Sequence, residues 1–440
     1  MERTPLESWI AGKLHLTGRP SAPRLREYQL RKLRETLEHV LAHSRYYRQS
    51  LTGIDPASIQ SMEDVARLPF TLPQALAERP TDFLCVSPQE VSRIVTLPTS
   101  GTSGRPKRIS FTLEDQELTV DFFHHGMTTL ARPASHVLIF LPGETEDSVG
   151  DLLKRGLARF DCQGIIFGPI CDYGQALQAV LETKPACAVG IPSQLLALSR
   201  HRECGLSGEN IQLESVLLCS DYVPQAAVDS LAAAWGCEVY SHYGSTEMGL
   251  GGGVECRARH GYHLREADLL FEIVDPASGK RVPDGHCGEV VFSTLTRRGM
   301  PFIRYRTGDR ACLLPEPCPC GSVLRRMERV SGRIGEAVRL ADGSGLSITL
   351  LDEVLLRHPN VSVFAAEIGT KDGCDCLTLT LRSTQPAADH QRIAEELQRQ
   401  ASIGTLIKRG HLKLEVREGA VESFTTGTAK RCIADRRNPG

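Results

Sequence analysis

The sequence contains no apolar run long enough to cross a membrane, no internal repeat and no low-complexity tract. Its net charge is only −2, from 51 basic and 53 acidic residues, so no global field favours nucleic acid or an acidic membrane surface. Residues 1–18 carry acids and lack a continuous apolar core, so they do not resemble a secretory signal. We therefore expect a cytoplasmic protein with no nucleic-acid or membrane partner.

The chain is long enough to bury a large core. Its 440 residues are 41% hydrophobic and 24% charged, which is ordinary for a globular protein, and this length predicts two or more domains. Fifteen cysteines are scattered along it, and in a chain otherwise typical of the cytosol most of them should stay reduced. Isolated cysteines such as Cys162 and Cys187 are expected to be small buried apolar residues.

The order of apolar patterns predicts an α/β fold. Residues 22–52 repeat apolar side chains at helical spacing, so an amphipathic helix should open the fold and pack on a larger body. From about 90 to 300, β-rich runs alternate with helical segments, which indicates parallel-rich sheets covered by helices. Near residue 270 the sequence pattern changes to paired strands with turn signals between them, which is typical of an antiparallel subdomain. The last hundred or so residues predict a small α+β domain.

Residues 97–112 read LPTSGTSGRPKRISFT and form a polar loop between two expected strands. Gly101 and Gly104 let the backbone approach a ligand closely, and Lys107 adds a positive charge. The remaining donors are Thr99, Ser100, Thr102 and Ser103. Such a set suits phosphate, but the spacing differs from the Walker pattern because Lys107 stands three residues after Gly104 and no Ser or Thr follows it. A polar surface turn is the alternative interpretation.

The segment TSGTSGRPK resembles the phosphate-binding loop of the adenylate-forming superfamily, which comprises acyl- and aryl-CoA ligases, peptide-synthetase adenylation domains and luciferases. Within it the sequence is most similar to the phenylacetate-CoA ligases. Supporting segments follow in order along nearly the whole chain: LPFTLPQAL at 68–76, GIPSQLLAL at 190–198, YSHYGSTEMGL at 240–250, RYRTGD at 304–309 and RVSGRIGE at 329–336. The resemblance implies an N-terminal AMP-binding domain over 1–334 and a mobile C-terminal domain over 335–440.

The resemblance also implies roles for individual residues. Tyr243 would stack on adenine, Thr246 would meet the α-phosphate, and Glu247 would help to hold a magnesium ion that bridges ATP phosphates. Asp309 would accept the ribose hydroxyls, and Arg333 would contact ribose or phosphate. The nucleotide-binding set is completed by loop residues 99–104, Gly244 and Ser245. Taken alone, the Ser-Thr-Glu segment at 245–247 would indicate a helix cap, Asp309 would be a turn aspartate, and Arg333 would be a solvated surface arginine.

The chemistry implied is attack of a substrate carboxylate on the α-phosphorus of ATP, which releases pyrophosphate and leaves an acyl adenylate. Coenzyme A then attacks the adenylate to form a thioester and release AMP. The protein needs no nucleophile of its own, because positioning and charge neutralisation by Mg²⁺, loop amides and Lys107 supply the rate. The expected substrate is an aryl or arylacetic acid, in a pocket built near residues 122–126, 190–193 and 242–251.

Two segments depart from the family pattern. Residues 219–224, CSDYVP, stand where the family usually carries an adenine contact of Gly-Glu-Pro type. Relatives also end with a Gly-Lys pair whose lysine reaches the site for adenylation, whereas here Gly427 is followed by Thr428. The nearest candidate is Lys430, which a strand would place on the same side as Thr428. The hinge of the mobile domain is expected near Glu336.

Four residues predict a structural zinc site. Cys318 and Cys320 form a Cys-x-Cys turn, while Cys256 and His263 lie more than fifty residues upstream, with His260 as a competitor of His263. Some phenylacetate-CoA ligase-like proteins carry zinc at corresponding positions. Four protein ligands leave no open position, so the ion would pin the subdomain rather than catalyse; reduced free thiols are the alternative.

Two other functions stay open from the sequence. The acyl adenylate could be transferred to an amine or a carrier protein instead of coenzyme A. The missing lysine at Thr428 also leaves room for a non-catalytic nucleotide-binding homologue. The sequence does not fix the oligomeric state, and a homodimer is one option.

Overall fold

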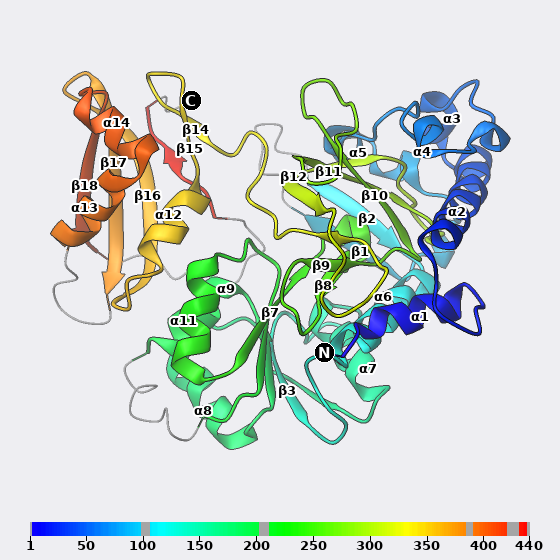
Figure 1. The fold of residues 1–440 in the computed structure, drawn as a ribbon, viewed down its shortest axis with the longest axis horizontal. Coiled ribbons are helices and arrows are strands. Elements are labelled where there is room, and N and C mark those ends of the chain that lie inside the picture. The colour runs from blue at the N-terminus through cyan, green and yellow to red at the C-terminus, as the bar shows by residue number, and fades with distance from the viewer. Residues whose placement is uncertain (1, 98–105, 202–210, 384–389, 420–430, 438–440) are drawn as a thin grey trace.

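The computed structural model describes residues 2–97, 106–201, 211–383, 390–419 and 431–437. Within these ranges, one eleven-stranded sheet runs through the larger part of the molecule in the order β10-β11-β12-β13-β9-β8-β7-β6-β5-β3-β4 (Figure 1). Its strands are β3 (His136–Phe140), β4 (Gln163–Ile166), β5 (Cys187–Gly190), β6 (Ser215–Leu218), β7 (Glu238–Tyr243), β8 (Gly253–Glu255), β9 (Tyr262–Leu264), β10 (Leu269–Val274), β11 (Cys287–Thr294), β12 (Tyr305–Leu314) and β13 (Arg326–Met327).

Strand β7 is the seam of this sheet. It pairs in parallel with β6 on one side and antiparallel with β8 on the other. Strands β3 to β6 are all parallel to their neighbours, whereas β8 to β13 are all antiparallel. The predicted parallel region and antiparallel subdomain are therefore confirmed, and the structure joins them into one continuous sheet.

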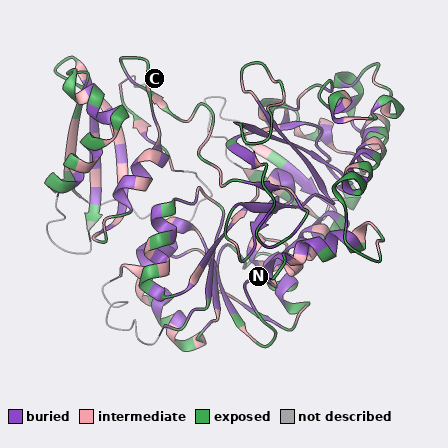
Figure 2. Cartoon of the chain, viewed as in Figure 1, coloured by how far each residue is buried: buried purple, intermediate pink, exposed green. Residues whose placement is uncertain are grey.

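Helices cover both faces of the parallel half, because alternate strand residues point to opposite sides. Leu138 and Val216 pack with α8 (Tyr173–Thr183), α9 (Pro192–Ser199) and α11 (Gln225–Trp235). Val137 and Leu217 pack with α6 (Leu113–Met127) and α7 (Val149–Ala158). Burial is concentrated on these strands (Figure 2), and their near-continuous apolar sequences follow from being covered on both faces.

The N-terminal region differs from the single helix predicted over 22–52. The fold opens with α1 (Pro5–Lys13), and the predicted helix divides at Ser44 into α2 (Ala22–His43) and α3 (Arg45–Ser50). Ser44 adopts an extended backbone, and its hydroxyl accepts a hydrogen bond from the Tyr47 amide. A serine N-cap thus begins a new helix where periodicity alone predicted continuation. The apolar face of α2 is buried, as expected.

Short elements connect α3 to the parallel half. The first are helices α4 (Met62–Val65) and α5 (Pro73–Glu78), with three 3₁₀ turns at Pro56–Ser58, Pro80–Phe83 and Pro88–Glu90. Strands β1 (Arg93–Leu97) and β2 (Lys107–Phe111) follow, and they form an antiparallel pair that sets Leu97 beside Lys107. The two ends of the glycine-rich loop are therefore adjacent.

The C-terminal region is a separate α+β layer, as predicted. Its four-stranded sheet has the order β18-β17-β16-β19, with β16 and β17 antiparallel and both outer pairs parallel. Its elements are β14 (Val338–Arg339), β15 (Gly345–Leu346), α12 (Ile348–Leu355), β16 (Val361–Lys371), β17 (Cys374–Ser383), α13 (His390–Arg399), α14 (Ala401–Lys408), β18 (Leu412–Glu418) and β19 (Ala434–Asp435). The domain boundary after residue 334 stays a prediction.

The C-terminal region docks on α11 and α9. Both oxygens of the Glu353 carboxylate accept hydrogen bonds from the first amides of α11, at Gln225 (2.7 Å) and Ala226 (3.1 Å). A carboxylate is favourable there because a helix N-terminus carries unpaired N–H groups and a partial positive charge. Arg200, at the end of α9, donates to the carbonyls of Leu356 and Val361. Polar contacts thus join the two regions at α9 and α11, beside a shared apolar cluster.

Cysteine usage follows the expectation of mostly reduced thiols. Twelve cysteines of the described ranges are free, and Cys162 and Cys187 are buried as predicted. Cys287 and Cys312, opposite each other on β11 and β12, form a disulfide. Among the described helices, none is both long and apolar enough to span a bilayer.

Arg304 ties the segment before α5 to the antiparallel strands. It is almost fully buried, forms a two-point ion pair with Glu272 at 3.0 Å for each bond, and donates to the carbonyls of Ala66 and Leu68. Its guanidinium also lies 4.1 Å from the centre of the Phe70 ring. Removing this side chain would leave the Glu272 carboxylate and two carbonyls buried without partners.

We therefore expect Arg304→Met to lower the free energy of unfolding by about 3–5 kcal/mol, measured by urea denaturation at pH 7. Arg310→Met is the matched control, because the Arg310 side chain is exposed, and it should change stability by less than about 0.5 kcal/mol. Equal effects of the two substitutions would contradict this account.

Candidate functional site

The candidate site lies where β7 ends, at the seam of the sheet. Tyr243 is the last residue of β7, and its hydroxyl donates a 3.1 Å hydrogen bond to Asp309 on β12. The Arg333 guanidinium lies 3.1 Å from the other oxygen of that carboxylate and also donates to the Thr307 carbonyl. Burial, reinforced by the Asp309 charge, raises the pKa of Tyr243 well above its usual value, so the phenol stays protonated and donates.

A second buried carboxylate, Glu247, lies on the loop that follows β7. Glu247 belongs to the short 3₁₀ turn Thr246–Met248, and it forms an ion pair with Lys107 at the start of β2. The Tyr305 hydroxyl donates to the same Glu247 oxygen at 2.9 Å. Burial alone would raise the pKa of Glu247, but Lys107 and then the hydrogen bonds more than offset it, so the carboxyl pKa falls below 4.5.

The residues expected to bind the nucleotide therefore converge. Tyr243 ends β7 and Glu247 lies on the loop that follows it, while Tyr305 and Asp309, which contact them, share the same face of β12. Sequence reasoning did not single out Tyr305, although its spacing of four residues from Asp309 on a strand was a usable signal.

The loop itself needs small residues. A Cβ at Gly244 would lie 2.4 Å from the Leu250 carbonyl oxygen, so only glycine fits there. Ser245 precedes the 3₁₀ turn in an extended conformation, which places Thr246 at its first position. The phosphate-loop residues Thr99, Ser100, Gly101, Thr102, Ser103 and Gly104, together with Lys430, lie outside the described residues.

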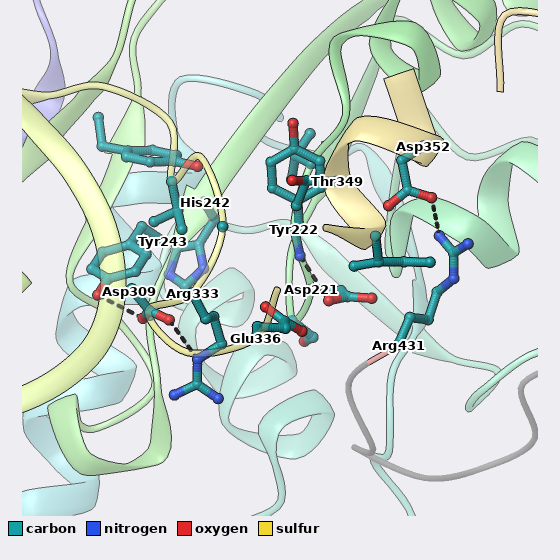
Figure 3. Close-up of a pocket in the computed structure, with 17 residues that line it drawn as sticks. Asp221, Tyr222, His242, Tyr243, Asp309, Arg333, Glu336, Thr349, Asp352 and Arg431 are labelled. Carbon is teal, nitrogen blue, oxygen red and sulfur yellow. Dashed lines mark hydrogen bonds and ion pairs between the residues drawn. The ribbon is translucent and has the colours of Figure 1, made fainter. Parts of the chain in front are cut away.

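A cavity of about 60 Å³ adjoins Tyr243, Asp309 and Arg333 (Figure 3). Asp221 and Tyr222 line it, so the segment that departs from the family pattern does reach the pocket. Ser220 has a φ of 69°, a left-handed turn that carries the chain off β6 toward this cavity.

The C-terminal region supplies the opposite wall, which sequence reasoning missed. Thr349, Asp352 and Arg431 line the pocket, and Figure 3 shows Asp352 and Arg431 on the opposite side from Tyr243 and Asp309. Asp352 and Arg431 form a buried ion pair. Burial raises the pKa of Asp352 to about 6 despite Arg431, with Asp221 and Glu353 adding to the rise. No local pattern marked these residues, because their role depends on how the two regions meet.

The expected acyl pocket is partly assembled. His242, beside Tyr243 on β7, packs against Phe122 and Phe123 of α6, with ring centres 6.1 and 6.2 Å apart. Residues 190–193 lie at the same end of the sheet, two strands away from β7.

The four predicted zinc ligands come together. Cys256, His263, Cys318 and Cys320 are buried, and their ligand atoms all lie within 4.8 Å of one another. The Cys256 and Cys318 sulfurs are 3.7 Å apart, and the Cys320 sulfur is 3.4 Å from His263 Nε2. These separations suit four ligands at about 2.0–2.3 Å from one tetrahedral ion. His260 instead pairs with Arg326 through Nδ1, which leaves His263 as the histidine of the cluster.

Comparison with known proteins agrees with this geometry. The AMP-binding enzyme family matches residues 29–296, and the chain therefore belongs to that family. A phenylacetate-coenzyme A ligase from Aromatoleum evansii is 28% identical over 98% of this chain and 99% of its own length. A second, from Thermus thermophilus, is 29% identical over 77% of this chain and 76% of its own. The chain is an adenylate-forming acid–thiol ligase of the phenylacetate-CoA ligase type, as the sequence motifs predicted.

Solved structures show the same fold. A 2-hydroxyisobutyryl-CoA ligase in its postadenylation state is 22% identical and superposes with a TM-score of 0.81, over 95% of this chain and 90% of that one. The same ligase in its thioesterification state gives a TM-score of 0.67 over 95% and 91%.

Lys107→Met would leave Glu247 buried without its cation, and we expect a stability loss near the lower end of about 3–5 kcal/mol at pH 8, since Lys107 is 17% exposed. In the wild type, the lowered pKa of Glu247 stabilises the folded state above about pH 4.5. This stabilisation is lost as the pH falls through the folded-state pKa of Glu247. In the variant, burial without Lys107 raises the pKa of Glu247 instead. The loss of stability caused by the substitution should therefore become smaller as the pH falls from 8 to 5.5. Urea denaturation at both pH values tests this.

Arg108→Met is the control for this experiment, because the neighbouring Arg108 side chain is exposed. It should show no such pH dependence. A Lys107→Met penalty of the same size at both pH values would mean that Glu247 does not depend on Lys107 for its charge.

Proposed function

We propose that the chain activates an aryl or arylacetic acid with ATP to an acyl adenylate and then transfers the acyl group to coenzyme A, releasing pyrophosphate and AMP. The observation that carries this proposal is the meeting of Lys107, Glu247 and Asp309 around the end of β7. Membership of the AMP-binding family and similarity to phenylacetate-coenzyme A ligases support it.

The nucleotide would bind along the Tyr243 side of the pocket. Asp309, already held ready by Tyr243 and Arg333, is placed to accept hydrogen bonds from ribose hydroxyls. Tyr243 offers an aromatic face to the base, and Arg333 offers charge to ribose or phosphate. Residues 99–104, which connect β1 to β2, would contribute backbone amides to the phosphates.

The anionic end of ATP would meet Lys107 and Glu247. Glu247 is a buried carboxylate whose pKa is lowered, so it suits Mg²⁺, a hard ion that prefers oxygen ligands. Bound Mg²⁺ would neutralise phosphate charge. Lys107, released from Glu247 by phosphate, would balance charge near the α-phosphorus while Thr246 contacts that phosphate. Both anions, the acid and ATP, would then be held in line for attack.

The C-terminal region would complete the adenylation site. Lys430, in place of the lysine absent at Thr428, is proposed to reach the reacting groups from this side. The hinge is proposed near Glu336, after Gly335, whose φ of 79° is accessible mainly to glycine. The boundary between a 1–334 AMP-binding domain and a 335–440 mobile domain belongs to this proposal, as do a cytoplasmic location and a homodimer.

A structural zinc ion is proposed at Cys256, His263, Cys318 and Cys320. The cluster connects the end of β8 and strand β9 to the turn after β12. The ion would therefore hold together strands that lie next to β7, where the candidate site is. Thiolates and one imidazole form a donor set that suits zinc, and all four ligands come from the protein.

The acceptor and the catalytic competence each have a rival. Transfer to an amine or a carrier would use the same adenylate, and a solved amide bond synthetase from Marinactinospora thermotolerans shares this fold, with a TM-score of 0.54 and 15% identity. A non-catalytic nucleotide-binding protein is the second rival, favoured by Thr428.

Pyrophosphate exchange over a panel of carboxylic acids tests the proposal. We expect exchange with at least one aryl or arylacetic acid, and a loss on the order of 100-fold in Glu247→Gln and in Lys430→Ala, because each removes charge stabilisation at the reacting phosphate. Lys408→Ala, an exposed lysine of α14, is the control and should keep wild-type rates. Offering CoA, an amine or a carrier separately then identifies the acceptor.

Each result of this panel separates the possibilities. Tight ATP binding without exchange for any acid would favour the non-catalytic protein. Full activity in Lys430→Ala would remove Lys430 as the substitute lysine while leaving the rest of the proposal in place.

Elemental analysis of the purified protein tests the zinc proposal. We expect about one zinc per chain, and both a lower zinc content and a melting temperature lower by several degrees in Cys320→Ser, because a structural metal contributes its binding energy to folding. Cys374→Ser, in the other Cys-x-Cys segment, should retain the metal. The site would be ruled out if the wild-type protein held no zinc and its three cysteine thiols and the His263 imidazole were all reactive.

A further inference from the structure

His242 carries a buried polar atom that nothing in the described structure satisfies. Its Nε2 is fully buried and has no hydrogen-bond partner within the described residues. The ring as a whole is half-buried, because part of it lines the pocket beside Tyr243 (Figure 3). A buried nitrogen left unpaired costs about 1–3 kcal/mol, whereas an apolar side chain in the same place would cost nothing of this kind.

The ring belongs to the acyl side of the site rather than to the nucleotide side. Successive residues of a strand point to opposite faces, so His242 points away from the Tyr243–Asp309 pair. It packs instead with Phe122 and Phe123 of α6. His242 lines the same pocket as Tyr243, and its contacts with Phe122 and Phe123 place its ring on the side of that pocket where we expect the organic part of the acid.

Two glycines lie beside the polar edge of the imidazole. A Cβ on Gly251 would stand 3.5 Å from Nε2, and a Cβ on Gly244 would stand 2.9 Å from Cε1 of the same ring. The Phe122 ring currently fills the space over Gly251, where a Cβ would be only 2.4 Å from it. An acyl group that contacts Nε2 would have to displace this aromatic ring.

The imidazole is neutral under ordinary conditions. Burial lowers the pKa of His242 to about 4, and the nearby Arg265 charge acts in the same direction. A neutral imidazole nitrogen accepts or donates a single hydrogen bond, depending on the tautomer. Such a nitrogen pairs well with uncharged hydroxyl, amino and carbonyl groups, each of which offers a donor or an acceptor.

We propose that His242 Nε2 hydrogen-bonds a polar group on the acyl part of the substrate, so that the preferred acid carries a hydroxyl, amino or carbonyl group in addition to the carboxylate that is activated. This inference rests on the proposed ligase function and narrows its substrate class. A plain hydrocarbon acid such as phenylacetate would leave Nε2 unpaired, and the site would discriminate against it.

The test compares kcat/KM for pyrophosphate exchange with matched acids. The series contains benzoate and phenylacetate as parents and their ring-hydroxylated and ring-aminated derivatives at each position. Wild-type protein should favour at least one polar derivative over its parent by about 10-fold or more. In His242→Phe that ratio should fall to about 2 or less, while His242→Gln, which keeps a polar amide, should restore part of it.

The ratio is the readout because general damage to the fold lowers both rates alike and leaves the ratio unchanged. His286→Phe, at an exposed histidine far along the chain, is the control and should keep the wild-type ratio. Melting temperature and ATP binding establish that each variant is folded.

Failure of this inference and failure of the ligase proposal give different results. No exchange with any acid in the wild type would overturn the ligase proposal itself. Exchange in which the wild type prefers the unsubstituted parents throughout the series would overturn the role of His242, whatever the variants do. A polar preference that survives in His242→Phe would overturn it as well.

Discussion

The site depends on two carboxylates buried around the end of β7, each held by one cation and one tyrosine hydroxyl. Glu247 has Lys107 and the Tyr305 hydroxyl, and Asp309 has Arg333 and the Tyr243 hydroxyl. Buried charges are tolerated only when paired and hydrogen-bonded, so these contacts hold the loop after β7 and the face of β12 in one arrangement. In the proposed function, a magnesium nucleotide would exchange these pairs for its own contacts.

Local patterns in the sequence predicted most of this architecture. Alternating strands and helices gave the parallel half, and the motifs around Tyr243 and Asp309 gave two site segments that the structure brings into contact. Local patterns could not predict contacts between distant segments. These contacts are the joining of both halves at β7, the Cys287–Cys312 pair and the pocket wall formed by Asp352 and Arg431, which depend on strand register or on docking. Periodicity also ran through Ser44, where capping decided the helix boundary.

The interface between the two regions sets what any rearrangement would cost. Glu353 satisfies amides at the start of α11, and Arg200 satisfies carbonyls beyond α12, so a rotation would expose four backbone groups and two charges to new partners or to water. The contacts described here are those of one arrangement, and a second would need its own set.

The strand order of the large sheet bears on how far the chain can be shortened. The family match ends at residue 296, after β11 but before β12 and β13. In space, those two later strands stand between β11 and β9. A polypeptide that ended at residue 296 would therefore leave β10 and β11 separated from the rest of the sheet. The edges of β11 and β9 would have unpaired backbone N–H and C=O groups, and chains can aggregate through such edges. The limits of sequence similarity and the limits of an independently folding unit fall at different places in this molecule.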